Sequence, residues 1–227
     1  YFKDFCGKHN LMFYLCGGGA IGAIREKGFV PWDDDIDCFM PRSDYEKFPA
    51  LWEKYGDKDR FVFCRSNEEV NFHHSCSSLR DPSTTFICSY NQNLDICHGV
   101  ALEFAPIDGC PNSKIKQYIQ LFHAFNYALF NTQRLPNNKG GFFRIAAKVI
   151  YKLVPSPHVR YLLWKHAEKQ MSKYKWEDCD NVRECIGSIK GMMWVHPKEW
   201  FSSQVWVDFE GYKVPLMAGY HQYLTRI

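Results

Sequence analysis

The chain has 227 residues, of which 46% are hydrophobic, and a formal net charge of +3 at pH 7. This length and composition are typical of one or two globular domains with a sizeable core, and the mild charge does not indicate a nucleic-acid partner. No run of about 18 or more apolar residues occurs, so we expect no membrane span in this segment.

The chain holds 10 cysteines and no Cys-x-x-Cys spacing. Because disulfide frameworks are typical of small secreted domains that lack a core, we expect reduced thiols in a cytosolic protein. Zinc is the alternative, and its candidate ligands are His73, His74, Cys76, Cys97 and His98.

The first predicted elements are a short helix over Tyr1–His9 and a strand over Met12–Cys16. The triplet Gly17-Gly18-Gly19 then forms a turn before a helix over Ala20–Lys27, which Gly28 ends as a left-handed C-cap. A strand, a glycine turn and a helix N-terminus form a phosphate cradle, because the glycines let the backbone approach and free N–H groups point at the anion. The chain has neither a P-loop motif nor the dinucleotide-binding fingerprint, so the triplet is a candidate phosphate site of another kind.

Four acidic residues follow in the segment Asp33-Asp34-Asp35-Ile36-Asp37, at the start of an apolar run. Side chains of an extended strand alternate between faces, so Asp33, Asp35 and Asp37 share one face. Like charges that lie this close raise one another's pKa unless a cation compensates them. Since Mg²⁺ is usually held by one or two carboxylates together with substrate phosphates, the segment predicts a metal site that handles a phosphate ester.

The acidic run has two other interpretations. One is a solvated acidic turn, which remains an alternative to the metal site. The other is an EF-hand loop, which needs Gly at its sixth position and Glu at its twelfth. Those positions hold Cys38 and Asp44, so an EF-hand is excluded.

The middle of the chain predicts a helix and two strands. Ser43-Asp-Tyr-Glu46 is a capping box that opens a helix ending at Gly56. Strands are expected over Phe61–Cys64 and Thr85–Ser89, with a loop over Arg80–Thr84 between them.

A further strand, Val100–Gly109, carries Glu103 among apolar residues. Burying a carboxylate there is costly unless it is paired or bound to metal, so Glu103 is a candidate site residue. Asp108 is a second candidate, although an Asp-Gly turn that ends the strand explains it equally well.

The remainder of the chain is predicted to be mainly helical and to end with a strand pair. The predicted elements are helices over Ser113–Gln133, Phe142–Leu153 and from Ser156 to about Tyr174, a polar loop over Asn137–Gly141, and a hairpin of Val205–Phe209 and Tyr212–Pro215 around Glu210-Gly211. We therefore expect a catalytic α/β part over residues 1–111 and a helical part with the returning strand pair over residues 112–227, joined in one integrated domain.

Three segments carry a resemblance to a known family. They read Gly-Gly-Gly-Ala-Ile-Gly-Ala-Ile-Arg over Gly17–Arg25, Lys-Gly-Phe-Val-Pro-Trp-Asp-Asp-Asp-Ile-Asp over Lys27–Asp37, and Met-Pro-Arg-Ser-Asp-Tyr-Glu-Lys-Phe over Met40–Phe48. This pattern resembles the LicD family, whose bacterial members are phosphocholine transferases and to which fukutin and fukutin-related protein are similar. The resemblance implies a nucleotidyltransferase fold of the α/β (α+β) class, a mixed sheet with flanking helices. In that fold a glycine motif, an Asp-x-Asp pair and a third acid on a later strand form the site.

By this resemblance the metal ligands are Asp35, Asp37 and Glu103, and the ion is Mg²⁺ or Mn²⁺. Glu103 stands where the family usually carries Asp, and Ala105 where it carries Phe. The additional methylene of Glu103 shifts its carboxylate by about one C–C bond, so its role is either direct ligand or general base. Asp33 binds a second metal or takes the acceptor proton.

The resemblance implies transfer of a phospho-alcohol, above all phosphocholine, from CDP-choline or a similar CDP-alcohol to a hydroxyl of a cell-surface glycan. CMP would be released in the bacterial cytoplasm or at the inner face of the membrane. The donor pyrophosphate would lie between the glycine triplet and the metal. Arg25 and Arg80 are candidate phosphate contacts because guanidinium grips phosphate bidentately, and the alternative for both is an exposed helix or loop position. A choline headgroup needs aromatic faces, and the candidate cage, with core packing as the alternative, is Trp194, Trp200, Trp206 and Tyr212.

Three other functions stay open. A CDP-ribitol or other phospho-alditol transferase would use the same residues, and a true nucleotidyltransferase would move a nucleoside monophosphate and release pyrophosphate. A non-catalytic binding module would have lost a metal ligand, and the presence of Asp35 and Asp37 argues against it.

Overall fold

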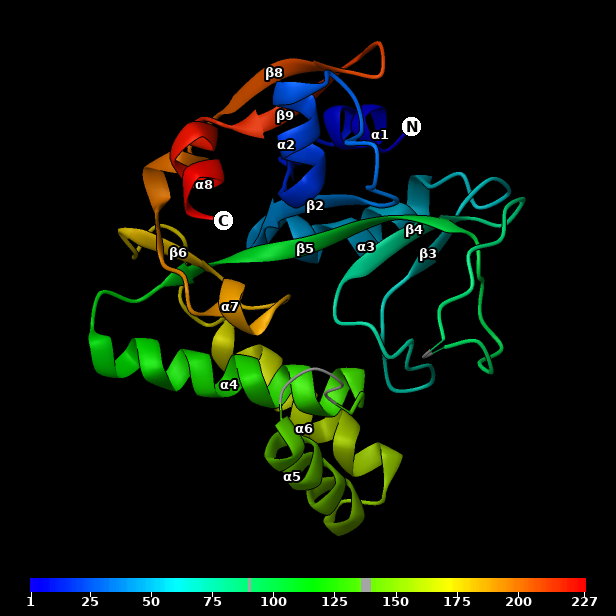
Figure 1. The fold of residues 1–227 in the computed structure, drawn as a ribbon, viewed down its shortest axis with the longest axis vertical. Coiled ribbons are helices and arrows are strands. Elements are labelled where there is room, and N and C mark those ends of the chain that lie inside the picture. The colour runs from blue at the N-terminus through cyan, green and yellow to red at the C-terminus, as the bar shows by residue number, and fades with distance from the viewer. Residues whose placement is uncertain (90, 136–139) are drawn as a thin grey trace.

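The computed structural model describes residues 1–89, 91–135 and 140–227 of the chain. It confirms the predicted fold class, because helices flank a mixed sheet (Figure 1). The helices are α1 (Phe2–Lys8), α2 (Gly17–Arg25), α3 (Arg42–Tyr55), α4 (Lys114–Thr132), α5 (Gly140–Leu153), α6 (Pro157–Met171), α7 (Ile189–Met192), the 3₁₀ helix η1 (Lys198–Phe201) and α8 (Tyr220–Arg226). The strands are β1 (Tyr14–Leu15), β2 (Ile36–Pro41), β3 (Val62–Cys64), β4 (Ser77–Asp81), β5 (Val100–Cys110), β6 (Asn181–Glu184), β7 (His196–Pro197), β8 (Gln204–Phe209) and β9 (Tyr212–Met217).

The long strand β5 organises the seven-stranded sheet. It pairs in parallel with β2 and antiparallel with β4 and β6. Parallel strands need a long crossover, and α3, β3 and β4 supply it between β2 and β5. The register places Asp37 beside Glu103, with Ser78 of β4 on the other side of Glu103. Acidic residues from two distant segments therefore come to lie on neighbouring strands.

The sheet separates two hydrophobic cores, because successive side chains of a strand point to opposite faces. Phe104 packs with Phe48 and the residues of α1 and α3, whereas Phe39 and Ile107 pack against α4 and α6. Figure 1 shows α4, α5 and α6 stacked on one side of the sheet, with the β8–β9 hairpin at the opposite end of the molecule. Helices α4 and α6 thus form a layer against one face of the sheet.

A buried ion-pair network attaches this helical layer to the sheet. Arg42 donates to both carboxylate oxygens of Asp108, at 2.7 and 2.9 Å, and lies 3.5 Å from Glu168 of α6. Arg65 pairs with the same Glu168 at 2.9 Å. Asp108 is fully buried inside β5, which continues to Cys110, so the predicted Asp-Gly turn is wrong. Because Arg42 compensates its charge, Asp108 serves the fold.

The glycine triplet is the first turn of α2 and does not form a separate turn before the helix, since α2 begins at Gly17. At the other end Lys27 takes the left-handed conformation, with a φ of 56°, so the prediction for Gly28 is wrong. Gly28 instead lies beside the side chain of Glu210. A Cβ there would lie 2.0 Å from the Glu210 carboxylate.

The capping box before α3 is also wrong. The helix begins at Arg42, and Ser43 makes no side-chain cap. The Asp44 carboxylate instead accepts a hydrogen bond of 2.9 Å from the backbone N–H of Met12, and Glu46 pairs with Arg65 at 3.0 Å. Long-range partners have taken the side chains that a local motif would use.

Two predictions between residues 80 and 89 fail, because Arg80 and Asp81 extend β4 and Thr85–Ser89 is not a strand. Phe86 in this loop donates its backbone N–H to the His98 carbonyl at 2.6 Å. The predicted loop over Asn137–Gly141 lies outside the described residues up to Lys139, and α5 begins at Gly140.

The remaining elements are confirmed. Helices α4, α5 and α6 occur as expected, and Ser156 caps α6 by accepting from Val159 N–H. The β8–β9 hairpin turns at Glu210 and Gly211, whose φ values are 49° and 76°. Across residues 1–89, 91–135 and 140–227, no helix unites the length and the apolar composition that a bilayer-crossing segment needs.

Candidate active site

Two of the predicted acidic residues, Asp37 and Glu103, line a cavity of about 540 Å³ between the sheet and α4. Asp37 of β2, Glu103 of β5 and Glu184 of β6 line it, together with Gly17 at the start of α2 and Arg134 just after α4. Three carboxylates, a helix N-terminus and a guanidinium thus face one space. Such a set suits a phosphate ester and a cation.

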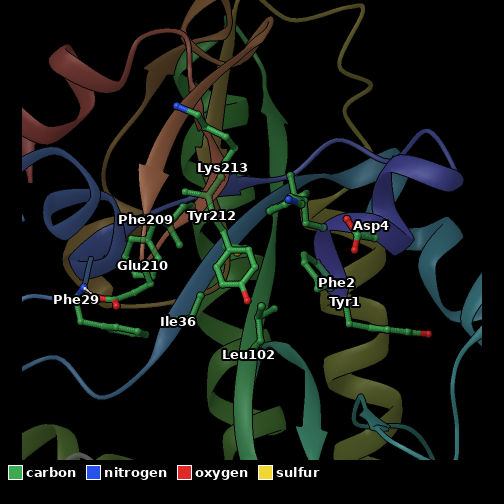
Figure 2. A pocket seen from close by; sticks show the side chains of 15 residues that line it. Tyr1, Phe2, Asp4, Phe29, Ile36, Leu102, Phe209, Glu210, Tyr212 and Lys213 are labelled. Carbon is green, nitrogen blue, oxygen red and sulfur yellow. Dashed lines mark hydrogen bonds between the residues drawn. The ribbon is translucent and has the colours of Figure 1, made fainter. Parts of the chain in front are cut away.

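Strand alternation separates this cavity from an apolar pocket on the other face of the sheet. Asp37 and Glu103 are in register, and so are their neighbours Ile36 and Leu102. Figure 2 shows Ile36 and Leu102 pointing into the second pocket, toward the ring of Tyr212. The carboxylates therefore collect on one face because the apolar residues between them occupy the other.

The carboxylates of the cavity hold their protons more tightly than usual. Burial, followed by the charges of Asp35 and Asp33, raises the pKa of Asp37 to about 6. Burial and the Asp37 charge raise the pKa of Glu103 to about 7 and that of Glu184 to about 8. Close carboxylates that resist ionisation are stabilised when a divalent cation compensates their charge.

Asp33 adds a second sign that a cation fits. Its Oδ2 is buried and has no hydrogen-bond partner among the described residues. The carboxylate lies against Gly18, where a Cβ would come within 2.3 Å of that oxygen. An unsatisfied carboxylate oxygen is a donor that Mg²⁺ or Mn²⁺ would take, although among the described residues the group of three donors within 4.8 Å of one another is His74, Cys76 and Glu103. Gly18 is thus needed for the approach of Asp33 to the start of α2.

Asp35 lies just outside the cavity. It is exposed and precedes β2, whereas Asp37 is the second residue of that strand. Its charge nevertheless raises the pKa of both Asp37 and Glu103, so it lies close to them. Its assignment as a metal ligand stays a prediction.

His74 and Cys76 form a second donor group with Glu103. The Nε2 atom of His74 lies 3.2 Å from Oε2 of Glu103, and the ligand atoms of the three residues all lie within 4.8 Å of one another. Burial lowers the pKa of His74 to about 4 and raises that of the Cys76 thiol. Of the five predicted zinc candidates, this group contains His74 and Cys76. The rings of His73 and His98 contact backbone carbonyls elsewhere.

The glycines of α2 have different environments. Gly17 lines the cavity, has a φ of 54°, and donates its N–H to the Tyr223 hydroxyl at 3.3 Å. A Cβ on Gly19 would lie 2.9 Å from Leu15. Gly17 therefore faces the site, whereas Gly18 and Gly19 allow close packing against Asp33 and Leu15.

The predicted arginines do not line the cavity. Arg25 is exposed in the last turn of α2, at the opposite end of that helix from Gly17. Arg80 is buried and donates to Ser78 and to the Cys97 carbonyl. Its charge opposes the rise in the pKa of Glu103 from within the sheet.

Two site residues escaped the sequence analysis. Glu184 lies between Arg183 and Cys185, so the charged neighbour interrupts the apolar run and the sequence signal is weaker than at Glu103. Its carboxylate lies against Gly187 and Gly191, where added Cβ atoms would come within 2.0 and 2.8 Å of it. Arg134 donates to the His73 carbonyl at 2.8 Å, and no local pattern marked it.

The four residues of the predicted aromatic cage do not share one pocket. The rings of Trp194 and Trp200 lie 6.3 and 5.6 Å from the ring of His196. Tyr212 lines the apolar pocket of Figure 2, and Trp206 lies beside α1. The structure therefore does not assemble this cage.

Residues 10–103 match a family model described as LicD/FKTN/FKRP, nucleotidyltransferase domain. The match ends at Glu103 and includes Asp33, Asp35 and Asp37. A lipopolysaccharide cholinephosphotransferase LicD from Haemophilus influenzae is 26% identical over 237 aligned positions, which cover 100% of this chain and 84% of that protein. Glu184 and Arg134 lie beyond the residues that the family model matches.

Proposed function

Residues 10–103 belong to the LicD family of nucleotidyltransferase domains, and on this premise we propose that the protein is a transferase for phospho-alcohols. The favoured reaction moves phosphocholine from CDP-choline to a hydroxyl of a cell-surface glycan, in the bacterial cytoplasm. The observation that carries the proposal is the in-register pair of Asp37 and Glu103 in the cavity that Gly17 also lines. The printed name of the Haemophilus influenzae relative supports choline and a glycan acceptor.

The transfer replaces one phosphate ester bond by another. The acceptor oxygen attacks the phosphorus that carries the alcohol, the bond from that phosphorus to the CMP oxygen breaks, and CMP leaves. A divalent cation held by Asp35, Asp37 and Glu103 would neutralise charge on the transferring group. Arg134 and the start of α2 supply the positive groups that bind the phosphates.

We assign to Glu184 the role of general base, which takes the proton of the acceptor hydroxyl. It lines the cavity, and its pKa of about 8 lies near neutral pH, where a general base is most effective. Asp33, the earlier candidate, lies against Gly18 and belongs to the cation side of the site. Glu184→Gln should therefore lower kcat by about a hundredfold and leave KM for the donor unchanged.

Calorimetry with CDP-choline and CDP-ribitol, with and without Mg²⁺, tests the proposal together with product analysis. We expect tighter binding of CDP-choline with Mg²⁺, and CMP as the nucleotide product when an acceptor is added. Release of pyrophosphate from CTP would show a true nucleotidyltransferase instead. Failure of both CDP-alcohols to bind would overturn the proposed donor class.

A further inference from the structure

The charge of the chain is distributed unevenly. Residues 111–175 hold 12 of the 28 basic residues and one of the 25 acidic residues, a formal charge of +11 that leaves the rest of the chain at −8. The one acid, Glu168, is buried and paired with Arg42, Arg65 and Lys165. This segment contains α4, α5 and α6, which we call the basic helical layer.

Helix α5 presents an apolar stripe to solvent. Ile145, Val149 and Leu153 are 63%, 51% and 75% exposed, and their spacing of four residues places them on one face of the helix. Within residues 144–153 of α5, Ala147 is buried and Ile150 packs against the core, both on another face of the helix. An apolar stripe of three aliphatic side chains this exposed marks an interaction surface.

Cations flank that stripe. Arg144, Lys148 and Lys152 each precede one residue of the stripe, and all three are exposed. Helix α5 contains no acidic residue. An aliphatic stripe beside a row of lysine and arginine side chains is the pattern of helices that lie in the interface of a bilayer.

Helices α4 and α6 also expose apolar side chains. Further exposed apolar side chains of the basic helical layer are Ile115, Tyr118 and Phe122 on α4 and Val159 and Leu162 on α6. Figure 1 shows α5 at the end of the molecule farthest from the β8–β9 hairpin, so the rest of the fold leaves this end accessible. Two copies of a surface with this charge would repel each other, and a polyanion without an apolar phase would leave the stripe in water.

We infer that the basic helical layer docks on an anionic lipid bilayer, with the stripe of α5 inserted at the level of the headgroups and the flanking cations on the lipid phosphates. The same layer contributes Ala128, Thr132 and Arg134 to the wall of the cavity. Docking would therefore hold the cavity beside the membrane surface. The inference rests on charge and exposure alone, so it stands whichever transfer the cavity performs.

Co-sedimentation of the full chain with vesicles tests this docking. Vesicles of phosphatidylcholine are compared with vesicles that also contain phosphatidylglycerol. We expect binding to the anionic vesicles only, and a loss of binding as the salt concentration rises. Lys148→Glu/Lys152→Glu and Ile145→Ser/Val149→Ser/Leu153→Ser should each weaken binding by at least about tenfold.

Matched controls separate docking from charge and folding. Lys8→Glu/Lys54→Glu makes the same charge change at exposed ends of α1 and α3, and should leave binding within about twofold of the parent, given screening over the distance to the layer. Circular dichroism and the melting temperature verify that each variant folds.

Three outcomes would overturn the inference. The first is that the protein does not bind anionic vesicles. The second is that Lys8→Glu/Lys54→Glu loses as much binding as Lys148→Glu/Lys152→Glu. The third is that the protein is retained on heparin while Ile145→Ser/Val149→Ser/Leu153→Ser binds vesicles as well as the parent. The last would assign the cations to a soluble polyanion.

Discussion

Asp37 and Glu103 are paired in register on the parallel strands β2 and β5. This pairing puts two carboxylates on one face of the sheet and leaves the opposite face to Ile36 and Leu102. Burial raises the pKa of both carboxylates, and the charge of Asp37 adds to the rise at Glu103. Five predictions test what this arrangement does.

Removing either acid of the Asp-x-Asp pair should abolish turnover. Asp35→Asn or Asp37→Asn takes away a proposed metal ligand, and Asp34→Asn, at an exposed neighbouring position, is the control. Because Asp37→Asn also relieves charge repulsion, its melting temperature without metal should equal or exceed that of the parent at pH 8. CMP release measured by chromatography checks the first point. Activity above a tenth of the parent's in either variant would sink the assignment.

Glu103→Gln should lower kcat far more than donor affinity, because it removes charge compensation that matters as the phosphoryl group transfers. Glu103→Asp should keep most of the activity, since it keeps a carboxylate on the same face of β5. Steady-state kinetics paired with calorimetry of CDP-choline separates the two effects. Equal losses of kcat and donor affinity in Glu103→Gln would assign Glu103 to donor binding.

Gly18→Val should weaken donor binding, because a side chain there displaces the Asp33 carboxylate, which lies 2.3 Å from the Cβ position. Gly18→Ala should also weaken donor binding. Adding Asp33→Ser to the Gly18→Ala variant should restore part of the donor affinity, because the shorter Ser side chain no longer clashes with the added Cβ. Gly7→Ala is the control, because a Cβ there meets nothing within 4 Å. Calorimetry measures the change in donor binding free energy in each single variant and in the double variant. If the changes of Gly18→Ala and Asp33→Ser simply add, the two residues are not coupled.

Arg134→Gln should reduce donor affinity by about tenfold or more, because a guanidinium bound to phosphate contributes about 1.5–3 kcal/mol. Arg25→Gln should have little effect, since Arg25 is exposed at the far end of α2. The comparison needs only donor titrations of the two folded variants. A larger loss in Arg25→Gln than in Arg134→Gln would reverse the assignment of the phosphate contacts.

The metal-free protein should lose stability between pH 7 and pH 8. The pKa values of Glu103 and Glu184 rise from 4.5 to about 7 and about 8 on folding, so in this range the folded state binds more protons than the unfolded chain. The free energy of unfolding therefore decreases as the pH rises, by about 1 kcal/mol over this interval. His74 and His196, with pKa values lowered to about 4, are mostly neutral in both states here and oppose the decrease by only about 0.1 kcal/mol each.

Urea unfolding at both pH values measures this slope. Glu184→Gln should flatten it, and Mg²⁺ should stabilise the protein more at pH 8, because a metal binds deprotonated carboxylates. Stability that rises with pH in the parent would contradict the raised pKa values.

Local patterns were enough to predict much of the molecule. Hydrophobic spacing predicted α4, α5 and α6, and Ser156 with Pro157 marked the start of α6. Glu103 was found because a carboxylate within an apolar run needs a partner, and the structure places it beside Asp37 in the cavity wall. These predictions succeeded because periodicity, capping and the cost of burying charge act between residues close in the chain.

Only the tertiary structure decided which charged residues share a site. Asp108 gave the same signal as Glu103, yet it pairs with Arg42 and joins α3 to β5. Glu184 enters the cavity because β6 pairs with β5 across a long stretch of chain, and Arg134 enters because α4 ends beside the sheet. A buried carboxylate demands compensation wherever it occurs. Whether an arginine, a neighbouring acid with a shared cation or a histidine supplies that compensation depends on contacts between segments far apart in the chain.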